Sequence, residues 1–202
     1  MVDLPSGKMK SREGTVVDAD ELIEEMNQKA KSISESLGKV NHLNDSNQLK
    51  LFNNIALGAL KYHILKVDPK KRILFDPNES IDFNGNTGPF IQYTYARIQS
   101  LLRKNTNKKS FNDISISEKE RNIIIQLNDY PNVLLNAYSN LNPSLIANYV
   151  YDLVKLYNSF YQSHTVLGNN DINSFRILLS KKVSEYIKKS MSLLGVSVPD
   201  RM

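Results

Sequence analysis

The sequence contains no cysteine, so it forms neither disulfide bonds nor thiolate metal sites, and a reducing cytoplasm is the compartment we expect. No run of 18 apolar residues is present, which excludes a membrane-spanning helix, and the polar segment 1–10 lacks the apolar core of a signal peptide. The three histidines, His42, His63 and His164, are scattered without an HExxH-like spacing, so we expect no metal site.

Positive charge and tyrosine are concentrated in the second half of the chain. Residues 84–202 hold 14 Lys and Arg against 8 Asp and Glu, whereas residues 1–83 hold 12 against 13. Nine of the ten tyrosines also lie after residue 83. Basic groups neutralise phosphates and aromatic faces stack on unpaired bases, so this distribution is typical of a nucleic-acid-binding region. From composition alone, tyrosines that fill a helical core are the more frequent explanation.

Helical periodicity dominates the sequence and predicts an all-α fold. We expect helices over 18–37 and 47–65, a loop over 1–14 and a short strand within 72–76. The strongest break is the segment Asn84-Gly85-Asn86-Thr87-Gly88-Pro89, where Thr87 is a suitable N-cap and Pro89 suits a first turn. Five helices are predicted after this break and form a bundle, over 88–104, 117–127, 131 onward, 142–163 and 169–194.

One charged residue interrupts the apolar face of the last predicted helix. At 100° per residue, Arg176 falls on the same stripe as Phe175, Leu179 and Val183. A charge on such a stripe either extends to solvent or has a buried partner. The sequence leaves open a solvated side chain, a guanidinium that orders the bundle, and a contact with nucleic acid.

The segment Leu4-Pro5-Ser6-Gly7-Lys8-Met9-Lys10-Ser11-Arg12-Glu13-Gly14-Thr15-Val16-Val17-Asp18 carries a basic cluster in a loop. Lysine and arginine can offset the charge that grows on a leaving pyrophosphate, although such clusters are often only solvated loops. The segment resembles the KMSKS loop of class I aminoacyl-tRNA synthetases in its arginyl form. The resemblance implies that Lys10 has the catalytic, phosphate-contacting role and that Lys8, Ser11 and Arg12 help to bind ATP; the roles of Lys8 and Lys10 are interchangeable in this copy.

A second segment, Phe83-Asn84-Gly85-Asn86-Thr87-Gly88-Pro89-Phe90-Ile91-Gln92-Tyr93-Thr94-Tyr95-Ala96-Arg97, is similar to the element that opens the anticodon-binding domain of arginyl-tRNA synthetases. Phe90 stands where that family often has tyrosine. On a helix Phe90, Tyr93 and Arg97 share one face, and two rings with a guanidinium can stack and hydrogen-bond an unstacked base. The same face would also serve as core material.

The resemblance covers nearly the whole chain. It implies the end of a catalytic domain with connector helices over 1–82 and a helical anticodon-binding (DALR) domain over 83–202. It further implies that Phe90, Tyr93, Arg97, Tyr157, Tyr161 and the terminal Met202 contact the anticodon stem-loop of tRNA(Arg).

No HIGH-type motif is present, so we expect a fragment of an arginine–tRNA ligase that lacks its N-terminal catalytic domain. The resemblance implies that the full-length parent attaches arginine to tRNA through an aminoacyl-adenylate, with ATP and Mg²⁺. We expect this chain alone to be inactive, monomeric and free of bound cofactor. A stand-alone helical module that binds RNA or protein, and a paralogue that has lost its chemistry, are the alternatives.

Overall fold

The computed structural model describes residues 2–3, 18–36, 45–105 and 114–202. Its first half contains α1 (Ala19–Ser36), α2 (Asp45–Leu65) and the single-turn α3 (Pro77–Ser80). Two short strands, β1 (Val2–Asp3) and β2 (Ile73–Leu74), pair in parallel with Val2 opposite Ile73. The strand at 73–74 confirms the prediction, whereas β1 lies in a segment that was predicted to be entirely loop.

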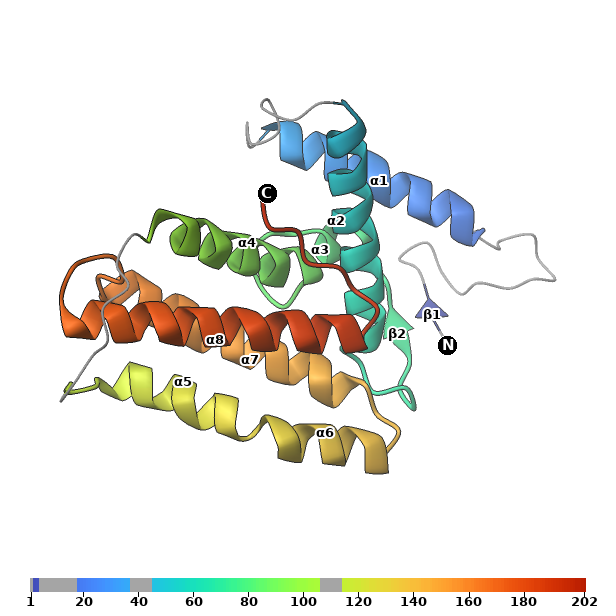
Figure 1. Ribbon diagram of the computed structural model, residues 1–202. Coiled ribbons are helices and arrows are strands. Elements are labelled where there is room, and N and C mark those ends of the chain that lie inside the picture. Colours follow the sequence, from blue (N-terminus) through green and yellow to red (C-terminus); the bar gives the residue numbers. More distant parts are fainter. Residues whose placement is uncertain (1, 4–17, 37–44, 106–113) are drawn as a thin grey trace.

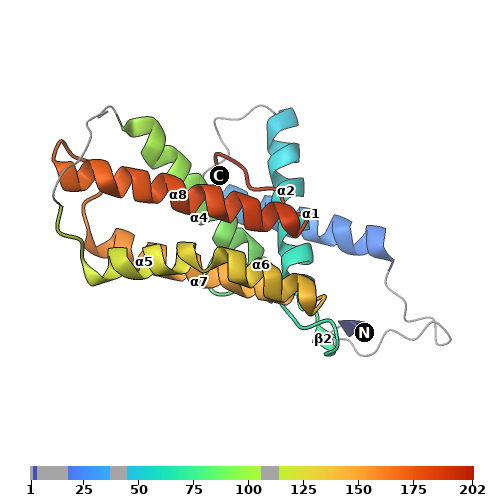
Figure 2. The ribbon, with the colours of Figure 1, turned by 60° about the horizontal axis from the view of Figure 1, so that its bottom comes forward.

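Five helices form the bundle predicted for the second half. They are α4 (Gly88–Lys104), α5 (Glu118–Asn128), α6 (Tyr130–Ser139), α7 (Ser144–Ser163) and α8 (Asp171–Leu193). Helices α7 and α8 form the middle of the bundle, with α4 on one side and the consecutive helices α5 and α6 on the other (Figure 1). After rotation of the molecule, α5 and α6 lie in front of α7 (Figure 2). The described part of the chain is therefore essentially all-α, as predicted.

Side-chain caps explain why α4 and α5 begin where the sequence predicted. The Thr87 hydroxyl accepts a hydrogen bond from the Phe90 N–H and so caps α4. At the start of α5 the Ser117 hydroxyl accepts from the Glu120 N–H, and the Glu120 carboxylate accepts from the Ser117 N–H at 2.6 Å. This is the capping box expected from the spacing of the two residues.

Glu120 also forms a buried ion pair, which decides between the interpretations of Arg176. The Arg176 Nε donates to Glu120 Oε1 at 2.6 Å, and its Nη1 donates to the Thr165 carbonyl at 2.9 Å. The side chains of Arg176 and Glu120 are only 15% and 0% exposed. Arg176 is thus the guanidinium that orders the bundle by tying α8 to α5, and it is not a solvated side chain.

Helix α4 lies close to α2 because two glycines face each other there. A Cβ added to Gly88 would lie 2.3 Å from the carbonyl oxygen of Gly58, which is far inside van der Waals contact. Packing against α2 therefore requires a glycine at position 88. This close approach sets the position of the α4 face that carries Phe90, Tyr93 and Arg97.

Two hydrophobic cores interlock across the predicted domain boundary at residues 82/83. The smaller core lies between α1 and α2 and includes Met26, Phe52 and Phe75. The larger core fills the bundle, yet it includes Tyr62 from α2. The boundary itself remains a prediction, because α2 contributes side chains to both cores.

The C-terminal segment after α8 runs across α4 towards the smaller core (Figure 1). The buried Gln92 amide donates to the Ser197 carbonyl at 2.7 Å and to the Asn54 carbonyl of α2 at 2.9 Å. The Tyr95 hydroxyl donates to Asp200 Oδ1 at 3.1 Å. The pKa of Tyr95 is raised to about 12, mainly by burial and secondly by the Asp200 carboxylate. These bonds hold the chain end against both α2 and α4.

Candidate nucleic-acid interface

The candidate site lies on the surface where α4 meets α7. Phe90, Tyr93 and Arg97 are all half-buried, with one side packed on the bundle and the other open to solvent. The helical spacing of Tyr93 and Arg97 places the guanidinium carbon 4.9 Å from the centroid of the Tyr93 ring. The predicted common face therefore exists, and it is accessible to a ligand.

Helix α7 adds a second ring to this face. The Arg97 guanidinium carbon lies 5.6 Å from the centroid of Tyr161, which is also half-buried. Arg97 thus lies over the rings of two tyrosines that are 68 positions apart in the sequence. We call Tyr93, Arg97 and Tyr161 the Arg97 sandwich. Cation–π attraction favours this arrangement by about 0.5–1 kcal/mol per ring at an exposed site.

A polar residue that the sequence analysis did not select completes the arrangement. The Arg97 Nη1 donates to the Asn158 Oδ1 at 3.3 Å, and the Asn158 Nδ2 donates to the Thr94 hydroxyl at 3.1 Å. Asn158 lies three residues before Tyr161, so the two share a side of α7. That spacing was the only available signal in the sequence.

Tyr157 does not reach the surface, which corrects its prediction as a tRNA contact. Its side chain is 0% exposed, and its hydroxyl donates to the Ser180 hydroxyl of α8 at 3.0 Å. Burial raises the pKa of Tyr157 well above that of a free phenol. Its ring stacks on Tyr161 with centroids 6.1 Å apart, so Tyr157 supports the site from below.

Phe90 belongs to a neighbouring group of rings. Its centroid lies 6.1 Å from that of Tyr151 on α7, and the Lys155 ammonium lies 5.0 Å from the Tyr151 centroid. Phe90 is therefore part of the same α4–α7 surface, although the ring that it contacts is not one of the Arg97 sandwich.

The chain end packs against the smaller core. Met202 and Phe83 both pack against the smaller core, and the Phe83 ring meets the edge of Tyr93 with centroids 6.3 Å apart. Met202 is half-buried, so part of its surface is available. The contact of Met202 with the anticodon loop stays a prediction.

The predicted ATP-binding residues Lys8, Lys10, Ser11 and Arg12 lie outside the residues that the structure describes. Within the described ranges, no group of three or more His, Cys, Asp or Glu is placed to hold a metal ion. The helices in those ranges also include none with the length and apolar character needed to cross a bilayer.

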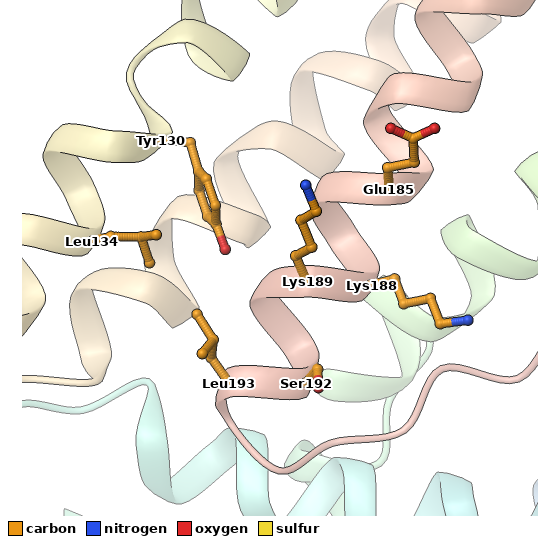
Figure 3. Close-up of a pocket in the computed structure, with 7 residues that line it drawn as sticks. All are labelled: Tyr130, Leu134, Glu185, Lys188, Lys189, Ser192 and Leu193. Carbon is orange, nitrogen blue, oxygen red and sulfur yellow. The ribbon is translucent and has the colours of Figure 1, made fainter.

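A shallow apolar hollow of about 590 Å³ lies elsewhere, between α6 and α8. Tyr130, Leu134 and Leu193 line it, while the Lys188 amine extends away from it (Figure 3). Tyr130 packs against Tyr149 and Tyr186 and is mostly buried. The residues that line the hollow include no arginine, whereas Arg97 lies over two rings at the α4–α7 surface, so we take that surface as the candidate site.

Comparison with known proteins gives one family and a consistent set of relatives. Residues 91–202 match the model of the DALR anticodon binding domain. The arginine–tRNA ligases of Flavobacterium psychrophilum and Parabacteroides distasonis are 57% and 50% identical over 100% of this chain, which spans 34% and 35% of those proteins.

Solved structures show the same fold. The Thermus thermophilus arginyl-tRNA synthetase matches with a TM-score of 0.90 and 27% identity, over 100% of this chain and 34% of that one. The Plasmodium falciparum arginyl-tRNA synthetase matches with a TM-score of 0.80 and 28% identity, over 93% of this chain and 34% of that one.

Proposed function

Because the chain belongs to the DALR anticodon binding domain family, we propose that its α4–α7 surface binds unstacked bases of a tRNA anticodon loop. The observation that carries this proposal is the Arg97 sandwich, in which the Arg97 guanidinium carbon lies over two half-exposed tyrosine rings. Sequence-specific RNA recognition relies on such rings and guanidinium planes, because loop bases can be splayed out and stacked on them. Phe90 extends the same surface, and we include Met202 in the proposal as the contact that the resemblance implies.

The proposal makes Arg97 the residue whose loss matters most for RNA binding. Replacing Arg97 by alanine is expected to weaken binding of an anticodon stem-loop RNA about 10–100-fold, the equivalent of one or two lost stacking or hydrogen-bonding contacts. Fluorescence anisotropy with a labelled stem-loop at fixed salt measures this effect, and the salt concentration is held constant because phosphate contacts are strongly salt-dependent.

A matched control separates the site from general positive charge. Arg121 is exposed on α5, which lies on the other side of α7 and α8 from α4 (Figure 1). Arg121→Ala removes the same charge and is expected to change the affinity less than about 3-fold. Equal losses for both variants, on every RNA tested, would instead indicate a module that binds RNA without selectivity.

The relatives suggest the reaction in which this surface takes part. We propose that the chain is the anticodon-binding portion of an arginine–tRNA ligase, whose complete form joins arginine to tRNA(Arg) with ATP and Mg²⁺. The identity of 57% over the entire chain supports this proposal. We further propose that Lys10, helped by Lys8, Ser11 and Arg12, contacts ATP in that complete form, that the protein acts in the cytoplasm and that it is a monomer.

The chain alone spans 34–35% of these relatives, and we therefore expect it to bind RNA without performing the reaction. In an ATP–pyrophosphate exchange assay with arginine and tRNA, the purified chain is expected to give the background rate. Exchange above the background of a heat-denatured sample would show that the chain holds a complete active site, and would leave the anticodon-binding proposal untouched.

A further inference from the structure

We infer that Asn158 is a positioning residue that fixes the rotation of the Arg97 guanidinium, and that Thr94 fixes Asn158 in turn. The inference rests on the proposed function, because it assumes that Arg97 meets an RNA base. It assigns base selectivity to a hydrogen-bonded relay beneath the surface, in addition to the rings that form the surface.

The relay begins at the backbone of α4 and ends at the guanidinium. The Thr94 hydroxyl donates to the Phe90 carbonyl at 3.0 Å and accepts from the Asn158 Nδ2 at 3.1 Å. The Asn158 Oδ1 then accepts from the Arg97 Nη1 at 3.3 Å. Thr94 is buried, at 1% exposure, so the relay is anchored in the packed interface between α4 and α7.

The relay has a single workable direction. Arg97 has only donors, whereas the Thr94 hydroxyl can both donate and accept. If the Asn158 amide were turned over, its NH₂ group would face the guanidinium donors and the contact with Arg97 would be lost. The Thr94 hydroxyl can rotate to suit either orientation, so Arg97 is the neighbour that holds the amide oxygen towards itself.

The rings and the amide restrain different motions of Arg97. Tyr93 and Tyr161 attract the Arg97 guanidinium by cation–π contacts of 4.9 and 5.6 Å, but such contacts are weakly directional and leave rotation within the guanidinium plane nearly free. The in-plane bond to Asn158 removes that rotation. Among the described residues, Asn158 is the hydrogen-bond partner of Arg97. The other N–H groups of Arg97 therefore point in one fixed direction and are available to a ligand.

Base edges are read by hydrogen bonds in the plane of the base, and a guanidinium is a planar fork of donors. A fork fixed in rotation favours a base that presents acceptors at matching positions. A fork free to rotate accepts several bases. Loss of Asn158 should therefore reduce discrimination between bases more than it reduces the affinity for the preferred loop.

The experiment uses stem-loop RNAs that differ in one loop base at a time, titrated against the full 202-residue chain by fluorescence anisotropy. The selectivity ratio is the Kd of the poorest base divided by that of the best, at the loop position where Arg97→Ala has the largest effect. We expect Asn158→Ala to lower this ratio about 10-fold, and Thr94→Val, which removes only the buried hydroxyl, to lower it about 3-fold.

Asn158→Asp keeps an acceptor oxygen towards Arg97, and the Thr94 hydroxyl can rotate to donate to its second oxygen. The selectivity ratio is therefore expected to be retained within about 2-fold, although the added negative charge weakens binding of every RNA. Loss of selectivity in Asn158→Ala together with its retention in Asn158→Asp is the pattern expected of a positioning residue. A residue that only packs would change the stability and leave the selectivity ratio unchanged. If Asn158→Ala does not fold, as judged by circular dichroism, the Thr94→Val result decides.

Two results would overturn the inference. Selectivity that survives in both Asn158→Ala and Thr94→Val while Arg97→Ala abolishes it would exclude the relay and leave the proposed function standing. Equal binding of every stem-loop by the unaltered chain, with no effect of Arg97→Ala, would refute the proposed function itself and the inference with it.

Discussion

Arg176→Leu is expected to lower the free energy of unfolding by about 3–5 kcal/mol, the range typical of breaking a buried ion pair by removing one partner. The loss is large because the Glu120 carboxylate stays buried, with 0% exposure, after its cationic partner is removed. Among the described residues, Ser117 of the capping box is then its remaining hydrogen-bond partner. Urea unfolding followed by circular dichroism at neutral pH measures the difference.

The pH dependence identifies the stranded carboxylate as the cause. Burial alone would raise the pKa of Glu120, but the hydrogen bonds from Ser117 and Arg176 outweigh burial and hold it below the usual 4.5. A depressed carboxyl pKa gives stability that is present above pH 4.5 and is lost as the pH falls through the folded-state pKa. The gap between the native chain and Arg176→Leu should therefore narrow in acid, where Glu120 becomes neutral in both.

A surface ion pair on α8 supplies the control. Lys182 pairs with Glu185 at 2.9 Å, and their side chains are 51% and 35% exposed. Lys182→Ala is expected to cost less than about 1 kcal/mol, since solvent screens such pairs. A loss for Arg176→Leu as small as that for Lys182→Ala would contradict the assignment of Arg176 as the tie between α5 and α8.

Local sequence signals were sufficient to predict where α4 and α5 begin, because each start is determined by a cap close in sequence. Thr87 before Gly88-Pro89 and the Ser117–Glu120 box are complete within four residues, and both are present in the structure. The second role of Glu120 was not predictable, because its partner Arg176 is 56 residues away. The sequence indicated only that Arg176 needed either a partner or a route to solvent.

The site was predictable along one helix and much less so between helices. The spacing of Tyr93 and Arg97 fixes their common face, whereas the sandwich also needs the position of α7 against α4. Tyr157 and Tyr161 are four residues apart and so differ by about 40° around α7. That rotation turns Tyr157 into the core while leaving Tyr161 at the surface, and the resemblance alone did not distinguish them.

The pair Tyr157 and Tyr161 therefore gives a direct test of which ring holds the fold and which meets RNA. Tyr157→Ala is expected to lower the free energy of unfolding by about 3–5 kcal/mol, as for other large aromatic side chains removed from a core. Tyr161→Ala removes the same atoms from the half-exposed ring of the Arg97 sandwich. We expect it to cost less stability and to weaken stem-loop binding about 10-fold.

Tyr157→Phe keeps the experiment informative even if Tyr157→Ala fails to fold. It retains the ring stacked on Tyr161 and removes only the hydroxyl that donates to Ser180, so the expected loss is about 0.5–1.5 kcal/mol with unchanged RNA affinity. Urea unfolding and anisotropy titration on the same samples measure both quantities. If Tyr157→Phe weakened RNA binding as much as Tyr161→Ala does, the buried hydroxyl would have to reach the RNA in the complex, and α7 would have to rotate on binding.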